Sequence, residues 1–170
     1  MEYRLHLALY QPDIAPNVGA CTRLAAALGL PLALIEPFGF VYDLRKLSRV
    51  ALDYQRLAEV TRHSGFAAFE TWRARSRRRL VLLTTAAATP YTQAVYRPGD
   101  VLLAGRESAG VPDDVHAAAD VSVVVPMAAG ARSLNVVTAL AMVAGEALRQ
   151  VGPQGPNDTK SELQRPEERA

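Results

Sequence analysis

The sequence predicts an α/β domain built on a mostly parallel sheet flanked by helices, and three observations support this fold class. The chain has 170 residues, the size of one domain. Its 49% hydrophobic content is that of a chain with a buried core. Short runs rich in Leu and Val alternate with helical patterns, and these runs lack the polar alternation of a half-exposed strand. Such alternation of strand and helix is typical of parallel sheets.

The elements are expected in the following order. Five strands are predicted, at Leu5–Tyr10, Leu32–Ile35, Leu80–Thr84, Val101–Ala104 and Val121–Val125, with a weaker sixth at Ala58–His63. Helices are predicted between or after them, at Val18–Leu28, Leu44–Val50, Phe66–Ala74, Asp113–Ala118 and Asn135–Gln150. We expect Asn17 to cap the first helix and Gly29 to end it.

Two features concern the C-terminal part of the chain. Apolar residues cover well over half of the circumference of the last helix, so it is expected to lie in the core or to pack against another chain. Residues 152–170 begin with Pro and Gly, continue with charges and contain no aromatic residue. This composition predicts a disordered tail after a single domain over residues 1–151.

Several protein classes are excluded. No run reaches the ~18 apolar residues of a membrane span, and the N-terminus does not resemble a signal peptide, so a cytoplasmic protein without membrane association is expected. The absence of Gly-x-Gly excludes the dinucleotide fingerprint, and the absence of Gly-x-Ser-x-Gly excludes a nucleophile elbow. Cys21 is the single cysteine and the three histidines stand far apart, so no metal site is expected.

Charge alone identifies no partner. The formal net charge is +2, and all but two of the 19 cations are arginine. This bias fits phosphate recognition, but a GC-rich genome produces the same bias. Gly105 to Gly110 has a Walker-like glycine spacing, yet Val111-Pro112 follows where a phosphate-binding Lys would stand.

Two segments that follow predicted strands contain candidate functional residues. In the first, Arg23 lies on an otherwise apolar helix six residues beyond Asn17. Its guanidinium could extend to solvent, or it could hold a phosphate or hydroxyl near the helix start. In the second, Gly105 and Gly110 flank Glu107. This segment is either a plain turn or a ligand site beyond the carboxyl end of a strand.

A third segment runs from Pro126-Met127 to Arg132-Ser133-Leu134-Asn135 and enters the last helix. Ser133 and Asn135 compete for the role of helix cap, and they could also be only caps. As in the other two segments, a strand leads into a loop and then a helix.

Together these segments resemble the three motifs of the SPOUT-class RNA 2′-O-methyltransferases. The matching strings are Asn17-x-Gly19-x-x-x-Arg23, Gly105-x-Glu107-x-x-Gly110-Val-Pro and Pro126-Met127 with Arg132-Ser133-Leu-Asn135. More narrowly, the chain is similar to the TrmL/YibK subfamily, which methylates the wobble nucleotide of certain tRNAs. That similarity rests on Leu9-Tyr-Gln-Pro-Asp-Ile-Ala-Pro-Asn, Ile35-Glu-Pro-Phe-Gly-Phe, Leu52-Asp-Tyr and Thr61-Arg-His.

The resemblance implies a SPOUT fold whose C-terminal half forms a deep trefoil knot, an exception to the rule of unknotted chains. It implies that S-adenosylmethionine is the methyl donor and that S-adenosylhomocysteine is the product. Methyl transfer from a positive sulfonium needs no metal, which is consistent with the missing ligand clusters. The implied cofactor-binding residues are Leu83, Gly105, Val125 and Ser133. The implied partners are a tRNA anticodon stem-loop and a second copy of the chain, packed through the first and last helices.

The resemblance also implies roles in catalysis. It gives Arg23, reaching the partner subunit's cofactor, the task of a base. Because arginine is effectively always protonated, we expect Arg23 to act as an electrostatic clamp instead. Asn17, Glu107 and Asn135 would orient the arginine and the substrate.

An arginine-rich turn at residues 73–79 is a candidate RNA-binding surface. The residues expected to contact phosphates are Arg75, Arg77, Arg78 and Arg79, although a charged run of this kind is also typical of a solvated loop. Three alternatives to wobble methylation stay open: methylation of another tRNA position or of rRNA, a non-catalytic RNA-binding dimer, and a phosphate-ligand enzyme.

Overall fold

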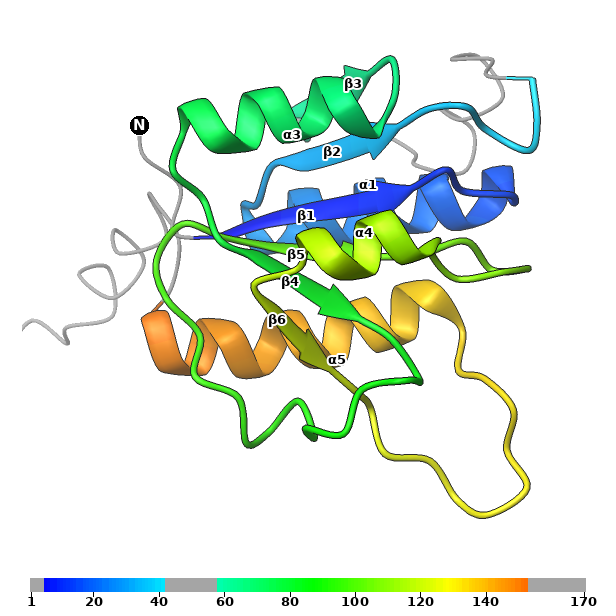
Figure 1. Cartoon of the computed structure of the whole chain (residues 1–170), viewed down its shortest axis with the longest axis vertical. Helices are drawn as coiled ribbons and strands as arrows, with labels where there is room; N and C mark the ends of the chain where they lie inside the picture. The colour runs from blue at the N-terminus through cyan, green and yellow to red at the C-terminus, as the bar shows by residue number, and fades with distance from the viewer. Residues whose placement is uncertain (1–4, 42–57, 153–170) are drawn as a thin grey trace, which may run out of the picture.

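A computed structural model of the chain describes residues 5–41 and 58–152. Six strands form one sheet in the order β3-β2-β1-β5-β4-β6, and every neighbouring pair is parallel (Figure 1). The strands are β1 Leu5–Tyr10, β2 Leu32–Ile35, β3 Val60–His63, β4 Leu80–Leu83, β5 Asp100–Ala104 and β6 Val121–Val123. The predicted α/β class and its parallel sheet are therefore confirmed.

The helices cover both faces of the sheet. They are α1 Ala15–Leu28, α3 Phe66–Arg75, α4 Asp113–Ala118 and α5 Val136–Val151. Alternate side chains of β1 enter two separate cores: Leu7 packs in the core that contains residues of α1 and α5, and Ala8 packs in the core that contains residues of α3 and α4. Figure 1 shows the same arrangement, with α1 and α5 together behind the sheet and α3 and α4 in front. Burial on both faces explains why the strands read as continuous apolar runs.

Most predicted boundaries agree with the structure within two residues, and the start of the first helix is the main exception. Helix α1 begins at Ala15, three residues before the predicted start, and its N-cap position is Ile14. Asn17 therefore does not cap this helix, contrary to the prediction. Pro16 lies in the first turn, where its fixed φ suits a helix and its missing N–H costs nothing, so the chain turns helical earlier. Gly29 ends the helix with φ +66°, as predicted.

Asn135, not Ser133, caps the last helix. Its side-chain oxygen accepts hydrogen bonds from the backbone N–H groups of Val137 and Thr138. The predicted helix at Leu44–Val50, the Leu52-Asp-Tyr string and the predicted tail beyond Gly152 lie outside the described residues. Within the described ranges, no helix is both long and apolar enough to span a membrane.

Candidate active site

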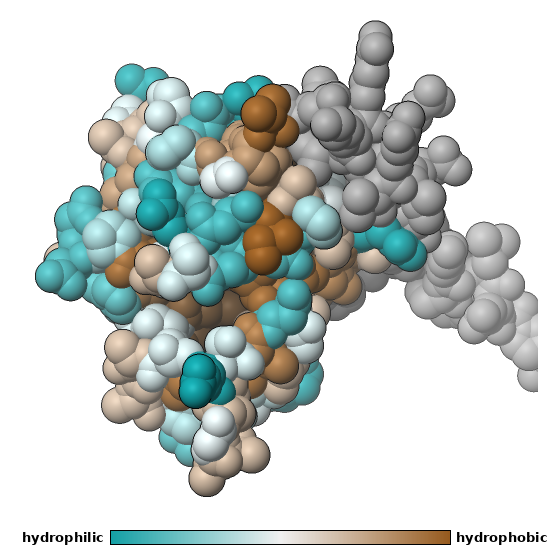
Figure 2. All heavy atoms as spheres, turned by 90° about the vertical axis from the view of Figure 1, so that its right-hand side faces the viewer, coloured by the Kyte–Doolittle hydropathy of each residue, from teal (hydrophilic) through white to brown (hydrophobic). Residues whose placement is uncertain are grey.

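A cavity of about 370 Å³ opens at the edge of the sheet where the carboxyl ends of β4, β5 and β6 meet. Parallel strands bring the loops that follow them to one edge, which is where ligands bind in open α/β sheets. Figure 2 faces this edge and shows a hollow with an apolar floor. The described residues that line the cavity come from the loops after these strands, the approach to α5 and the start of α1. They include Ile14, Leu83, Thr84, Glu107, Val111, Val123, Met127, Arg132 and Asn135.

All four residues expected to bind the cofactor line this cavity. Leu83 ends β4, Gly105 follows β5, Val125 follows β6, and Ser133 lies in the loop before α5. The structure thus brings together positions as far apart in sequence as 83 and 133. Whether they bind a cofactor stays a prediction.

Gly105 lies in the cavity wall, at a point where two backbone segments approach each other closely. Backbone hydrogen bonds of 2.9 and 3.0 Å join Arg106 to Gly110 in both directions and close the turn. A Cβ atom on Gly105 would lie 2.7 Å from the carbonyl carbon of Gly110, closer than real Cβ atoms come to backbone. Gly110 itself has φ +64°, a conformation that favours glycine. The two glycines are therefore required by the shape of this turn.

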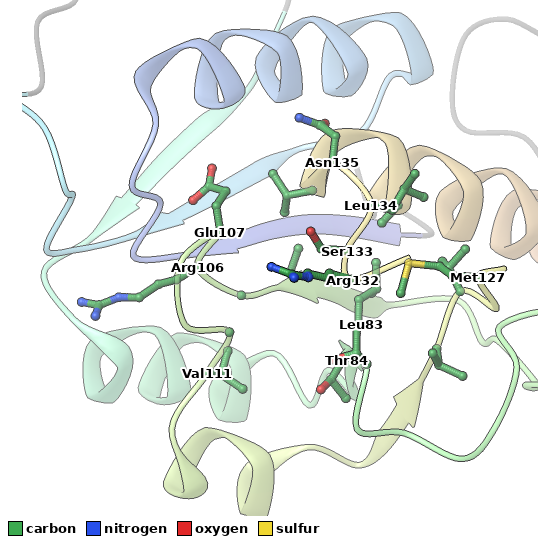
Figure 3. A pocket seen from close by; sticks show the side chains of 18 of the residues that line it. Leu83, Thr84, Arg106, Glu107, Val111, Met127, Arg132, Ser133, Leu134 and Asn135 are labelled. Carbon is green, nitrogen blue, oxygen red and sulfur yellow. The ribbon is translucent and has the colours of Figure 1, made fainter. Parts of the chain in front are cut away.

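Three of the four predicted catalytic residues form one hydrogen-bonded chain. Asn17 donates from its side-chain amide to Oε1 of Glu107 at 2.8 Å, and its Oδ1 accepts from Nδ2 of Asn135 at 3.1 Å. Asn135 uses its other side-chain atom to cap α5. These hydrogen bonds link the start of α1, the turn after β5 and the start of α5. Figure 3 shows Glu107 in the turn after β5 and Asn135 at the start of α5.

Asp13 and Ser108, which no sequence pattern indicated, help to hold the first two segments together. Oε2 of Glu107 accepts a hydrogen bond from the backbone N–H of Asp13 at 2.9 Å. The Asp13 carboxylate in turn accepts from the backbone N–H of Ser108 at 3.0 Å and from its hydroxyl. The hydroxyl of Ser108 is the main cause that lowers the pKa of Asp13. Short polar residues in both turns were visible in the sequence, but nothing in it indicated that they pair.

Arg23 is not among the residues that line the cavity of its own chain. Its side chain is exposed on α1. The six residues from Asn17 correspond to a rotation of about 240° around the helix, so the two side chains leave α1 on different faces. The structure of one chain therefore does not bring Arg23 to the other predicted catalytic residues.

The arginine-rich turn lies between α3 and β4, at the amino end of β4, whereas the cavity lies at the carboxyl ends of the strands. Arg79 forms an ion pair at 2.7 Å with the buried Asp100, and Arg73 pairs with Glu70 and Asp120. Arg78 lies over the ring of Trp72, 5.9 Å from its centroid. Arg75 and Arg77 are exposed. The predicted RNA contacts of this turn remain a prediction.

No group of three or more His, Cys, Asp or Glu side chains with metal-binding geometry occurs in residues 5–41 and 58–152. The chemistry that the cavity offers is that of an apolar floor and a rim of amides, hydroxyls, one carboxylate and two guanidinium groups. Such a mixture suits a ligand with both an apolar and a polar part.

Residues 4–145 match the SpoU rRNA Methylase family. This chain belongs to that family. The resemblance noted in the sequence is thereby confirmed, and the six-stranded parallel sheet agrees with the solved structures of SpoU methyltransferases.

One named relative and two solved structures are similar to this chain over most of its length. A protein of Beijerinckia indica, named tRNA (cytidine(34)-2′-O)-methyltransferase, is 55% identical over 146 residues, which cover 86% of this chain and 91% of that protein. A solved structure concerned with 2-OH methylation of C/U34 on tRNA is 41% identical and covers 88% of this chain and 97% of its own, with a TM-score of 0.81. The SpoU methyltransferase AviRb of Streptomyces viridochromogenes, solved with AdoMet, is 25% identical, with a TM-score of 0.80 over 88% of this chain and 62% of its own.

Proposed function

We propose that this protein is a tRNA 2′-O-methyltransferase that transfers a methyl group from S-adenosylmethionine to the ribose 2′-hydroxyl of the wobble nucleotide, cytidine or uridine 34. The observation that carries the proposal is the cavity at the carboxyl edge of the sheet, where the segments of all three motifs meet. The relatives that are named for this reaction support it. The product would be S-adenosylhomocysteine.

The residues of the cavity fit this cofactor. Its volume of about 370 Å³ lies in the range of small-molecule sites. Leu83, Val123 and Val125 provide an apolar surface suited to a purine, and Ser133 offers a hydroxyl at the rim. The cofactor supplies, when bound, an activated methyl group on a sulfonium, so the proposed transfer requires no metal. A family relative solved with AdoMet supports this assignment.

Glu107, Asn17 and Asn135 are proposed to position the site rather than to exchange protons with the substrate. Both carboxylate oxygens of Glu107 already accept hydrogen bonds, from Asn17 and from the backbone of Asp13. These bonds fix the turn after β5 against the start of α1, and Asn135 fixes the start of α5 to the same cluster. A preorganised wall of this kind keeps the bound groups in the geometry that reaction requires.

Arg23 is proposed to complete the site of a second subunit in a homodimer. Helices α1 and α5 pack side by side on one face of the sheet, and α5 leaves Met142 39% exposed on its surface. A dimer through these helices would bring a guanidinium to the partner's cavity. There it would act as a clamp that stabilises the developing alkoxide, since arginine does not release its proton at ordinary pH.

The finer features of the fold belong to the same proposal. We propose that residues 1–151 form one SPOUT domain whose C-terminal half is threaded as a deep trefoil knot, since the family resemblance implies it. The arginine-rich turn, through Arg75 and Arg77, is proposed to contact tRNA phosphates away from the anticodon nucleotide. A tRNA substrate also favours a cytoplasmic location for the enzyme.

The test is mass spectrometry of tRNA nucleosides from a strain that lacks the gene, followed by methylation of the undermethylated tRNA with purified protein. The expected result is loss of one 2′-O-methyl group that maps to position 34 and its restoration in vitro. Loss of a 2′-O-methyl group at another tRNA position or in rRNA would change the proposed substrate. An unchanged set of nucleosides, with no methyl transfer in vitro, would contradict the proposed function.

A further inference from the structure

Three charged residues line the cavity, and two of them are already engaged. Glu107 accepts hydrogen bonds from Asn17 and Asp13, as described above. Arg106 donates to the side-chain oxygen of Gln11, and Figure 3 shows its side chain extending away from the cavity. The third, Arg132, directs its side chain into the cavity (Figure 3).

Arg132 makes no hydrogen bond or ion pair with the part of the chain that the structure describes. The carboxylate of Glu107, which lines the same cavity, forms no ion pair with Arg132; it accepts hydrogen bonds from Asn17 and Asp13 instead. Arg132 is exposed in the loop between β6 and α5, so its guanidinium is accessible from solvent. A cation held in this position can bind an anion that approaches from solvent.

The chemistry of the anion follows from what else the cavity would hold. A guanidinium beside a sulfonium repels it, so Arg132 is favourable only where it faces a negatively charged group. Its planar set of N–H donors matches the oxygens of a phosphate and binds two of them at once. RNA carries such a phosphate on each side of the ribose that receives the methyl group.

We infer that Arg132 binds a phosphate flanking the target nucleotide and thereby places that ribose in the cavity. This inference rests on the proposed function, because it takes RNA as the substrate. It gives the loop before α5 two tasks at neighbouring positions: Ser133 faces the cofactor, and Arg132 holds the RNA backbone. Since a phosphate carries no base identity, Arg132 would contribute affinity and position but no preference for cytidine or uridine.

The experiment compares Arg132→Ala and Arg132→Lys with the matched control Arg97→Ala. Arg97 is also exposed, and it precedes the amino end of β5, away from the cavity. Its replacement by alanine removes one positive charge, as Arg132→Ala does. Binding of tRNA is measured at several salt concentrations, and binding of S-adenosylhomocysteine is measured by isothermal titration. Thermal melting verifies that each variant is folded.

For Arg132→Ala we expect tRNA affinity to fall about tenfold or more, as for loss of a charge-assisted pair. The slope of log affinity against log salt should become shallower by about one unit. Arg132→Lys should keep the slope and recover part of the affinity, while Arg97→Ala should match the wild type. Binding of S-adenosylhomocysteine should change by less than about twofold, well below the effect of a lost ion pair.

Two results would overturn the inference. Weakened binding of S-adenosylhomocysteine with unchanged tRNA affinity would assign Arg132 to the carboxylate of the cofactor. Equal salt slopes for Arg132→Ala and Arg97→Ala would show that Arg132 contacts no phosphate. Neither result bears on the proposed function, which is tested separately on the wild-type protein by binding of S-adenosylhomocysteine and by methylation of position 34.

Discussion

Asn17 and Glu107, ninety residues apart in the sequence, are joined by a side-chain hydrogen bond of 2.8 Å. Glu107 accepts a second bond from the backbone of Asp13, so one carboxylate holds both the start of α1 and the loop before it. Asn17 also accepts a hydrogen bond from the side chain of Asn135 at the start of α5. The wall of the cavity is therefore assembled by side chains from three elements that are not neighbours in sequence.

The first prediction concerns Glu107→Gln. The glutamine would place an NH₂ group against one of two donors, either the Asn17 amide or the Asp13 N–H. An unsatisfied polar group of this kind costs about 1–3 kcal/mol. We therefore expect the wall of the cavity to shift, so that methyl transfer falls by about 10- to 100-fold because the bound groups lose the geometry that reaction requires. Single-turnover methylation assays measure it, and Glu59→Gln, an exposed glutamate before β3, is the control. Wild-type turnover in Glu107→Gln would show that the carboxylate does not organise the site.

The sequence predicted these residues as a group but not their contacts. Motif spacing identified Asn17, Glu107 and Asn135. The rule that ligands bind beyond the carboxyl ends of parallel strands placed their loops at the same end of the sheet. The prediction that Asn17 caps α1 was wrong because the effect of Pro16 in the first turn outweighed the capping preference of Asn17. Freed from that role, Asn17 bonds to Glu107. Contacts such as Asp13 with Ser108 depend on how the two turns pack, which a single sequence does not encode in any local pattern.

The second prediction tests whether Arg23 acts across a dimer. Arg23→Ala and Glu107→Gln should each be strongly impaired alone, because one lacks the clamp and the other a correctly formed cavity. In mixed dimers one of the two sites contains an intact Arg23 and an intact cavity. A 1:1 mixture that exchanges subunits freely should therefore recover about a quarter of wild-type activity.

Two measurements support that experiment. Analytical ultracentrifugation should show a dimer for the wild type and a monomer for Met142→Arg, which places a charge on the exposed face of α5. If Arg23→Ala is inactive and mixing restores nothing although subunits exchange, Arg23 serves its own subunit. In that case the proposed dimeric site is wrong.

The third prediction separates the arginines of the turn at residues 73–79. Arg75 and Arg77 are exposed, so Arg75→Ala with Arg77→Ala should leave stability unchanged and reduce the salt slope of tRNA binding by up to about two units. Arg79→Ala should behave differently, because it leaves the carboxylate of Asp100, which is 1% exposed, without its ion pair. Breaking such a pair costs about 3–5 kcal/mol, so this variant should unfold at lower denaturant. An unchanged salt slope in the double variant would exclude Arg75 and Arg77 as phosphate contacts.

The fourth prediction concerns pH. His6 is buried in β1 against Trp72, and burial, assisted by the charge of Arg78, lowers its pKa from 6.5 to about 4. Between these values the unfolded chain binds a proton that the folded chain does not, so the free energy of unfolding falls as the pH drops from about 6.5 to 4. The loss from this group amounts to up to about 3 kcal/mol.

Replacement of His6 by Phe isolates that contribution from the carboxylates, which also titrate in this range. Urea unfolding of both proteins at pH 7.5 and pH 4.5 is the measurement. The stability of His6→Phe relative to the wild type should improve markedly at the lower pH. If the free energy of unfolding changes equally in both proteins between the two pH values, His6 is not held neutral in the fold.

The most direct test of the whole account is titration of S-adenosylhomocysteine into the wild type, Gly105→Ala and Gly65→Ala. Gly105 has no space for a methyl group, since its Cβ would lie 2.7 Å from the backbone of Gly110, whereas nothing lies within 4 Å of a Cβ on Gly65. We predict binding by the wild type and Gly65→Ala, and affinity reduced by about tenfold or more in Gly105→Ala, as overpacking of a tight site implies. Absence of binding by the wild type, or equal affinity in all three proteins, would contradict the assignment of this cavity as the methyl-donor site.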